Sequence, residues 1–180
     1  MEVGPGQLAY IYFTSGSTGE PKGAMCEHAG MLNHLFAKID DLGIGPGGTV
    51  VAQTAPAVLR HLPVAAAGVA AGGRADPAGG AGRGRGRRTL RGHPGPRPGG
   101  GVAQVVPSYL EVMVAYLERH PRDLPDLTCV SVTGGEALKR ELVQRWFALR
   151  PGIRLVNAYG LTETSDDTNH EVMEAVPDRV

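Results

Sequence analysis

The sequence predicts an α/β fold, in which a mostly parallel sheet is flanked by helices, with an irregular middle segment. Two observations support this fold class. Short apolar runs of strand length alternate with longer segments whose apolar residues recur at helical spacing. Residues 58–101 are rich in Gly, Arg and Pro and have no periodic apolar face, so they separate an N-terminal part, 1–57, from a C-terminal part, 102–180.

The N-terminal part begins with a predicted strand that runs into a loop rich in Gly, Ser and Thr. Residues 8–13 are apolar or aromatic, and the glycines after them allow several backbone N–H groups to converge on an anion. The hydroxyl groups add donors, and the lysine adds a compact positive charge. We therefore predict a nucleotide-phosphate site made of Thr14, Ser15, Gly16, Ser17, Thr18, Gly19 and Lys22.

This loop differs from the two common phosphate-binding signatures. The P-loop places Lys directly after Gly and Ser or Thr directly after Lys, whereas here two residues separate Gly19 from Lys22 and Gly23 follows. The three-glycine spacing of dinucleotide-binding loops is also missing. A Ser/Thr/Gly linker is the alternative interpretation, and the ordered pattern over residues 8–23 argues against it.

A helix is predicted next, over residues 27–42, with Gly43 as its stop. Its start beside the loop would direct a positive helix end towards phosphate. Residues 49–54 then predict a buried parallel strand, which completes a βαβ pattern. The sequence places no cysteine or carboxylate cluster at ligand spacing around His28 and His34, so we do not expect them to bind a metal. The apolar residues at helical spacing are Met31, Leu32, Leu35, Phe36, Ile39 and Leu42.

The net charge of zero hides an uneven distribution. Residues 58–101 hold 8 of the 18 basic residues and one acid, so the remainder carries 10 bases against 17 acids, a net charge of −7. The Gly-Arg repeat at 82–88 could attract nucleic-acid phosphates. No aromatic residue is interleaved to stack on bases, so we do not expect nucleic-acid binding.

The C-terminal part opens with a predicted strand at 102–106 and a helix at 108–119. Ser108 and Glu111 have the spacing of a capping box. The next strand, 129–133, ends at Gly134-Gly135-Glu136. The apolar face expected for the helix consists of Tyr109, Val112, Met113, Tyr116 and Leu117.

Another helix is predicted over residues 137–149, and a strand at 155–158 follows it. This strand runs into the block Asn157-Ala158-Tyr159-Gly160-Leu161-Thr162-Glu163. The residues of the helix that we expect in the core are Leu138, Leu142, Val143, Trp146 and Phe147.

Three blocks of this sequence resemble, in the same order, the signature motifs of adenylate-forming enzymes: residues 14–23, 134–136 and 157–163. The preceding run, 8–13, is similar to the amino-acid-activating adenylation domains of nonribosomal peptide synthetases. Leu161 stands where that family has proline. The resemblance implies part of the large subdomain of an adenylation domain, which uses ATP to convert an amino acid into an aminoacyl adenylate and passes it to a carrier protein.

The resemblance also implies roles for single residues. Tyr159 would stack on adenine, and Asn157 would read an adenine edge through its amide. Thr162 would bond the α-phosphate, and Glu163 would hold Mg²⁺. Lys22, Thr162 and Glu163 then form the implied catalytic set. The implied nucleotide-binding set further includes Gly134, Gly135, Glu136, Ala158 and Gly160.

By the same resemblance, the amino-acid pocket would have polar, small and acidic walls. Asp166 and Asp167 could give it negative charge and favour a substrate with a basic or amine-bearing side chain. Hydrated acids in a loop are the alternative. The implied walls are Ser108, Val132, Gly134, Ala158, Asp166 and Asp167.

The family's Phe-Asp-x-Ser motif, whose aspartate holds the substrate's amino group, does not occur in this sequence. Residues 58–63 read one base later can encode Phe-Asp-Ile-Ser, and Ala, Gly, Arg and Pro are the residues specified by codons of G and C alone. Residues 58–101 are therefore either translated in the wrong frame or a disordered arm. Without this aspartate and the family's later catalytic lysine, we expect little or no adenylation by the chain.

Two other classes remain open. The first is a fragment of an acyl-CoA or aryl-acid AMP-forming ligase, which would share the loop and the Tyr-Gly-x-Thr-Glu block. The second is a non-enzymatic basic-linker protein, in which residues 58–101 would bind nucleic acid. Cys26 and Cys129 have no disulfide or metal-site spacing. No apolar run reaches membrane-spanning length. We therefore expect a cytoplasmic chain without membrane contact.

Overall fold

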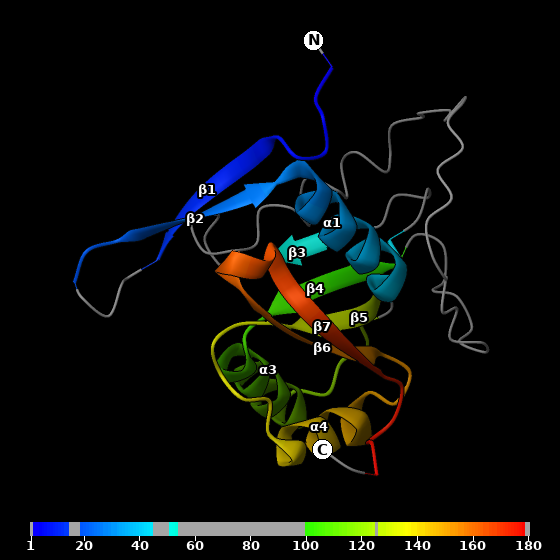
Figure 1. The fold of residues 1–180 in the computed structure, drawn as a ribbon. Helices are drawn as coiled ribbons and strands as arrows, with labels where there is room; N and C mark the ends of the chain where they lie inside the picture. Colours follow the sequence, from blue (N-terminus) through cyan, green and yellow to red (C-terminus); the bar gives the residue numbers. More distant parts are fainter. Residues whose placement is uncertain (1, 15–18, 45–50, 54–99, 125, 179–180) are drawn as a thin grey trace, which may run out of the picture.

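The computed structural model describes residues 2–14, 19–44, 51–53, 100–124 and 126–178 (Figure 1). These residues form a two-stranded hairpin and a five-stranded sheet in the order β3-β4-β5-β6-β7. The strands are β1 (Leu8–Thr14), β2 (Lys22–Glu27), β3 (Val51–Gln53), β4 (Gly101–Val105), β5 (Leu127–Val132), β6 (Arg154–Leu161) and β7 (Asp166–Met173). The helices are α1 (His28–Leu42), α3 (Pro107–Arg119), α4 (Arg140–Leu149) and the short 3-10 helix η1 (Thr162–Thr164).

The larger sheet is mostly parallel, which confirms the predicted fold class. Strands β3 to β6 run parallel to one another, with Val102 beside Cys129 and Val132 beside Asn157. Strand β7, which was not predicted, returns antiparallel beside β6. The predicted strands at 102–106, 129–133 and 155–158 correspond to β4, β5 and β6, and the prediction at 49–54 is confirmed for residues 51–53.

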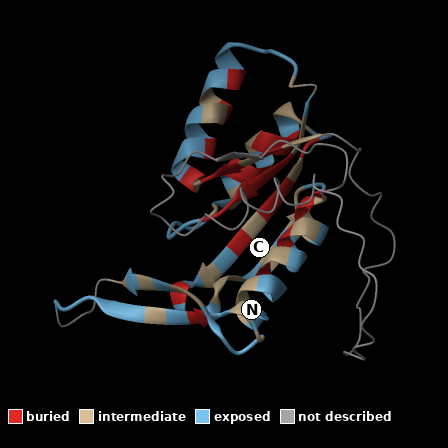
Figure 2. Ribbon diagram, turned by 90° about the horizontal axis from the view of Figure 1, so that it is seen from above, coloured by how far each residue is buried: buried red, intermediate tan, exposed pale blue. Residues whose placement is uncertain are grey.

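Helices cover both faces of this sheet (Figure 1). Helices α3 and α4 pack on one face, where Val130, Val132 and Trp146 belong to one core cluster. Helix α1 lies on the opposite face, where Leu42 packs with Cys129 and Val156. Alternate residues of β5 therefore enter different clusters, as the two-residue period of a strand requires. Figure 2 shows buried residues concentrated along the central strands.

The first strand does not belong to the parallel sheet, so the predicted βαβ pattern is wrong at its start. Strand β1 pairs antiparallel with β2, from Leu8 opposite Glu27 to Thr14 opposite Lys22. Helix α1 therefore begins at the far end of β2 from Lys22, and the expected placement of its N-terminus beside the phosphate loop is also wrong. The chain turns back into a hairpin here because residues 22–27 form a half-buried strand, in which Ala24 and Cys26 are less exposed than their neighbours.

Helix α1 ends where predicted, with Gly43 in the left-handed conformation. The expected apolar face is only partly buried, because Leu32 and Phe36 are 43% and 62% exposed. The helix instead buries His34 and Lys38, which are 3% and 1% exposed. The acidic start of β7 lies opposite these two side chains and provides the partners for their burial.

Helix α3 also differs from its predicted details. It begins one residue earlier, at Pro107, and Ser108 and Glu111 do not form a capping box. Leu117 is buried and Met113 is half-buried, as expected. Tyr109, Val112 and Tyr116 are exposed, however, because the helix turns an aliphatic row towards the sheet instead. That row consists of Leu110, Val114 and Leu117.

Helix α4 begins at Arg140, three residues later than predicted. Its predicted core residues Leu142, Val143, Trp146 and Phe147 are all buried, and Leu138 before the helix is partly buried against the same cluster. The Trp146 ring is 0% exposed, and its Nε1–H donates a hydrogen bond to the Ile153 carbonyl at 3.0 Å. None of the helices in the described part of the chain has the length and apolar composition needed to cross a bilayer.

We predict that Trp146→Ala lowers the free energy of unfolding by about 3–5 kcal/mol, since it leaves a large cavity in the α3 and α4 cluster. Urea denaturation followed by circular dichroism measures the change. The matched control is Val112→Ala on the exposed side of α3, where Val112 is 66% exposed. That control should stay within about 0.5 kcal/mol of the unchanged chain. Equal effects of the two substitutions would contradict the assigned core.

Candidate functional site

Two of the motif blocks and the predicted pocket residue Ser108 follow three neighbouring parallel strands. Ser108 comes shortly after β4, Gly134-Gly135-Glu136 follow β5, and Tyr159 to Glu163 lie at the end of β6. The carboxyl ends of parallel strands meet at one edge of a sheet, and ligands bind there in open α/β sheets. This edge is the candidate site.

The carboxylate of Glu136 joins the Gly134-Gly135-Glu136 block to Ser108. The Ser108 backbone N–H donates to Glu136 Oε2 at 3.0 Å, and the Ser108 hydroxyl donates to Glu136 Oε1 at 3.1 Å. The carboxylate thus accepts from the first turn of α3, where negative charge is stabilised. Gly134 has a φ of 124°, and a Cβ there would lie 3.0 Å from Val106 Cγ1. The strand end therefore requires glycine at this position.

The third block forms a tight connection between β6 and β7. Ala158 is buried, Asn157 is half-buried, and the Tyr159 ring is 63% exposed. A Cβ at Gly160 would collide with the backbone of Asp166 and Asp167. Ser165 and Asp166 have positive φ values of 66° and 95°, which are unusual for residues other than glycine. Backbone strain is thus concentrated at this turn.

Helix η1 contacts the hairpin that carries the predicted phosphate loop. The Cys26 thiol of β2 donates to the Thr162 carbonyl at 3.5 Å, and Thr162 is only 4% exposed. Glu163, next to it, is exposed. The Thr14 hydroxyl donates to the Lys22 carbonyl at 3.4 Å across the hairpin. The structure therefore brings the strand of Lys22 against the block that contains Thr162 and Glu163.

Part of the predicted phosphate site lies outside the described residues. Ser15, Gly16, Ser17 and Thr18 belong to this part. Residues 58–99 of the Gly/Arg/Pro-rich segment also lie outside the described residues. Gly19 is described, is exposed, and has a φ of 86°. Thr14 and Lys22 pair with each other at the end of the hairpin, so they flank the loop that connects β1 to β2.

The predicted pocket residues Asp166 and Asp167 contact α1. Lys38 Nζ lies 2.8 Å from Asp167 Oδ2 and 3.5 Å from Asp166 Oδ2. The Asp167 side chain is 3% exposed, so the alternative of hydrated loop acids is wrong for Asp167. Burial alone would raise the pKa of Asp167, but its hydrogen bond with His170 and the charge of Lys38 hold that pKa far below its usual range.

His170 lies between two carboxylates. Its Nδ1 is 2.7 Å from Asp41 Oδ2 on α1, and its Nε2 is 3.1 Å from Asp167 Oδ2. Burial lowers the pKa of His170, but the hydrogen bonds with Asp167 and Asp41 outweigh it and raise the pKa to about 9. His170 is therefore protonated at neutral pH and links α1 to β7.

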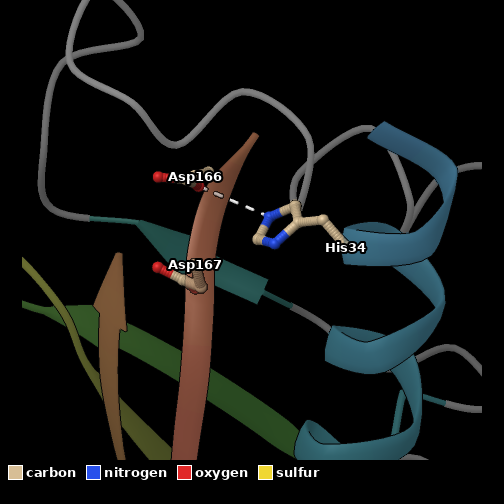
Figure 3. A group of neighbouring side chains, drawn as sticks. All are labelled: His34, Asp166 and Asp167. Carbon is tan, nitrogen blue, oxygen red and sulfur yellow. Dashed lines mark ion pairs between the residues drawn. The ribbon is translucent and has the colours of Figure 1, made fainter. Parts of the chain in front are cut away.

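His34 completes this group of side chains. Its ring points towards Asp166, with Nε2 3.4 Å from Asp166 Oδ2 (Figure 3). The proximity of His34, Asp166 and Asp167 was not predicted from the sequence, because Asp166 lies more than a hundred residues from His34 in the chain and no local spacing signals it. The adjacent pair Asp166-Asp167 was the only sequence feature that pointed to concentrated charge here.

We predict that His170 stabilises the fold in a pH-dependent way. Its folded pKa of about 9 lies above the ordinary value of 6.5, so its contribution is complete below pH 6.5 and is lost as the pH rises to about 9. Urea midpoints of the unchanged chain and His170→Gln, measured from pH 5.5 to 10, should differ most at the acid end. A constant difference over that range would contradict the assignment.

We predict that Gly160→Ala destabilises the chain by about 3 kcal/mol, since the new Cβ overlaps the backbone of the β6–β7 connection. Gly152→Ala is the matched control: a Cβ at Gly152 meets nothing within 4 Å. That control should change the free energy of unfolding, measured by urea denaturation, by no more than about 0.5 kcal/mol. If Gly160→Ala left the free energy of unfolding unchanged, the close approach of Gly160 to the backbone of Asp166 and Asp167 would be contradicted.

Several synthetases are similar to the chain in sequence. It is 32% identical over 169 residues to a linear gramicidin synthase protein of Brevibacillus parabrevis, a match that covers 91% of the chain and 3% of that protein. It is 34% identical over 183 residues to the phosphinothricin tripeptide synthetase PhsB of Streptomyces viridochromogenes, covering 93% of the chain and 14% of that protein. The chain thus spans a small fraction of the length of these relatives.

Solved structures share the fold. The structure of PA1221, described as a nonribosomal peptide synthetase protein with adenylation and PCP domains, matches with a TM-score of 0.66 and 24% identity, over 96% of the chain and 35% of that protein's chain. The crystal structure of VinN matches with a TM-score of 0.64 and 21% identity, over 92% and 40% of the two chains. The family model of AMP-binding enzymes matches residues 1–179. Because this family model matches nearly the whole chain, the chain belongs to the AMP-binding enzyme family.

Proposed function

We propose that this chain is the nucleotide-binding part of an amino-acid-activating adenylation domain of nonribosomal peptide synthesis. The observation that carries the proposal is the convergence of Ser108 after β4 with the motif blocks after β5 and β6 at one edge of the sheet, in a chain of the AMP-binding family. The relatives described as peptide synthetases support the amino-acid class of substrate.

The adenine of ATP would bind at the end of β6. The Tyr159 side chain is 63% exposed, so its ring is accessible to a base, and stacking on an aromatic ring suits adenine. The half-buried Asn157 lies two residues earlier on the same strand and offers an amide to the base edge. Gly134, Gly135, Ala158 and Gly160 supply backbone without bulky side chains around this position.

The phosphates would lie between the hairpin and η1. Lys22, the loop residues from Thr14 to Gly19 and the hydroxyl of Thr162 supply positive charge and hydrogen-bond donors. Glu163 suits Mg²⁺, because this ion commonly takes one or two carboxylates together with phosphate oxygens and waters, and Glu163 is an exposed carboxylate next to Thr162. Bound there, the ion would neutralise phosphate charge.

The reaction would join the amino acid to AMP. A carboxylate oxygen of the amino acid attacks the α-phosphorus of ATP, the bond to the β-phosphate oxygen breaks, and pyrophosphate leaves. The protein contributes positioning and charge neutralisation, through Lys22, Thr162 and the loop amides. The adenylate would then pass to a carrier protein. The occurrence of adenylation and PCP domains together in PA1221 supports this partner.

The amino-acid pocket would be bordered by the ends of the central strands. Val132 on β5 pairs with Asn157 on β6, beside Ala158. Ser108 and Gly134 are at the same edge, and Asp166 and Asp167 are at the start of β7. We place this chemistry in the cytoplasm, in keeping with the free thiols of Cys26 and Cys129.

We further propose that the chain by itself has little adenylation activity. The sequence has no Phe-Asp-x-Ser motif to hold the substrate's amino group, and an anchor of this kind contributes to transition-state binding. Amino-acid-dependent exchange between ATP and pyrophosphate measures the activity. Exchange with amino acids at the rate of an intact adenylation domain would contradict this proposal, and exchange with aryl or acyl acids alone would favour the ligase alternative.

We predict that ATP binds the chain in the presence of Mg²⁺ and that Tyr159→Ala weakens this binding by about 1–3 kcal/mol, the value of stacking a base on an aromatic ring. Isothermal titration calorimetry measures the binding. Tyr116→Ala is the matched control, because Tyr116 is a 46% exposed tyrosine on α3, outside the proposed site. Loss of ATP binding in both variants, or in neither, would contradict the role of Tyr159.

A further inference from the structure

A cluster of five ionisable side chains is buried between α1 and β7. We call it the α1–β7 cluster: His34, Lys38, Asp166, Asp167 and His170. Their side chains are between 1% and 11% exposed. Burying charge away from water is costly unless each charge is compensated, so the two buried aspartates need cationic partners.

Three members of the cluster have the composition of a metal site. Ligand atoms of His34, Asp166 and Asp167 all lie within 4.8 Å of one another (Figure 3). Among the described residues, neither ring nitrogen of His34 has a hydrogen-bond partner, although His34 is only 3% exposed. One imidazole and two carboxylates would suit a transition-metal ion.

Lys38 argues against a metal ion in this place. Its ammonium is 1% exposed and contacts Oδ2 of both aspartates, at 2.8 Å for Asp167 and 3.5 Å for Asp166. With His170 protonated, the cluster holds two negative and two positive charges and is neutral. The carboxylate of Asp41, which also contacts His170, is 39% exposed and therefore solvated. A divalent ion would leave two uncompensated positive charges at a buried site.

We propose that Lys38 is the resident cation of the α1–β7 cluster and occupies the position that a metal ion or a cationic substrate group would otherwise take between Asp166 and Asp167. Lys38 is thus a specificity-determining residue that acts through the two aspartates. It makes the adjoining pocket accept amino acids with uncharged side chains in place of basic ones. This last step rests on the proposed function, whereas the exclusion of metal ions does not.

The geometry at Asp166 and Asp167 supports this role. Asp167 Oδ2 has two close cationic partners, Lys38 at 2.8 Å and His170 at 3.1 Å, so its charge is already paired. Asp166 is held in a strained backbone conformation with a φ of 95°, and its carboxylate is directed towards His34 and Lys38. Neither carboxylate is left to select a substrate ammonium group.

Removal of Lys38 should convert the cluster into a cation site. In the 180-residue chain, we expect Lys38→Met to bind Mn²⁺ at least about tenfold more tightly than the unchanged chain, with paramagnetic broadening of the His34 ring signals in NMR. L-Ornithine should shift the same signals in Lys38→Met but not in the unchanged chain. L-Norvaline, which has no side-chain ammonium to place between the aspartates, should shift them no more in Lys38→Met than in the unchanged chain.

The double variant Lys38→Met/Asp167→Asn is the matched control. It lacks the same ammonium but keeps the cluster neutral, so the gain in Mn²⁺ and ornithine binding should disappear. If Lys38→Met is unfolded by circular dichroism, Mn²⁺ should restore its folding, because a metal that binds only the folded state stabilises that state.

Specific outcomes overturn the proposal. Binding of Mn²⁺ or ornithine at His34 in the unchanged chain would show that Lys38 does not occupy the cation position between Asp166 and Asp167. The same conclusion follows if folded Lys38→Met gains no affinity for Mn²⁺, or if unfolded Lys38→Met is not rescued by it. ATP binding is measured separately: its failure would overturn the proposed function while the Mn²⁺ results still decide the role of Lys38.

Discussion

The positions of the other elements depend on the burial of the central strand β5 on both of its faces. Cys129 and Val130 are each 0% exposed, and they point to opposite faces. Such a strand needs helices on both sides, and α1 on one face with α3 and α4 on the other provide them. Because its neighbours β4 and β6 run parallel to it, the segments that follow all three strands reach the same edge.

The candidate site at that edge is held together by contacts between segments distant in sequence. Glu136 accepts two hydrogen bonds from Ser108, which joins the end of β5 to the start of α3. Cys26 donates to the Thr162 carbonyl, which joins the N-terminal hairpin to the end of β6. These contacts do not involve the side chains of Tyr159 and Glu163, so they position the strand ends while Tyr159 and Glu163 remain exposed to a ligand.

Whereas Tyr159 and Glu163 are exposed, charged side chains are buried between α1 and β7. Lys38 contacts Asp167, and His170 bridges Asp167 and Asp41. Each charge is tolerated because a partner of opposite sign lies against it, and removal of one partner would leave an uncompensated charge. The network therefore fixes α1 against the strained start of β7.

The sequence by itself determined the parallel strands, the core of α4 and the motif blocks, because these depend on local apolar period and on short ordered patterns. Tertiary structure decided the rest of the site. The β1–β2 hairpin, the buried side of α3 and the partners of Asp166 and Asp167 were missed or misplaced. The partners of a buried charge cannot be read from local spacing: Lys38 and Asp166 are 128 residues apart, and only the packing of α1 on the sheet brings them together. A lysine in a helix is ordinarily exposed to solvent, whereas the packing of α1 on the sheet buries Lys38.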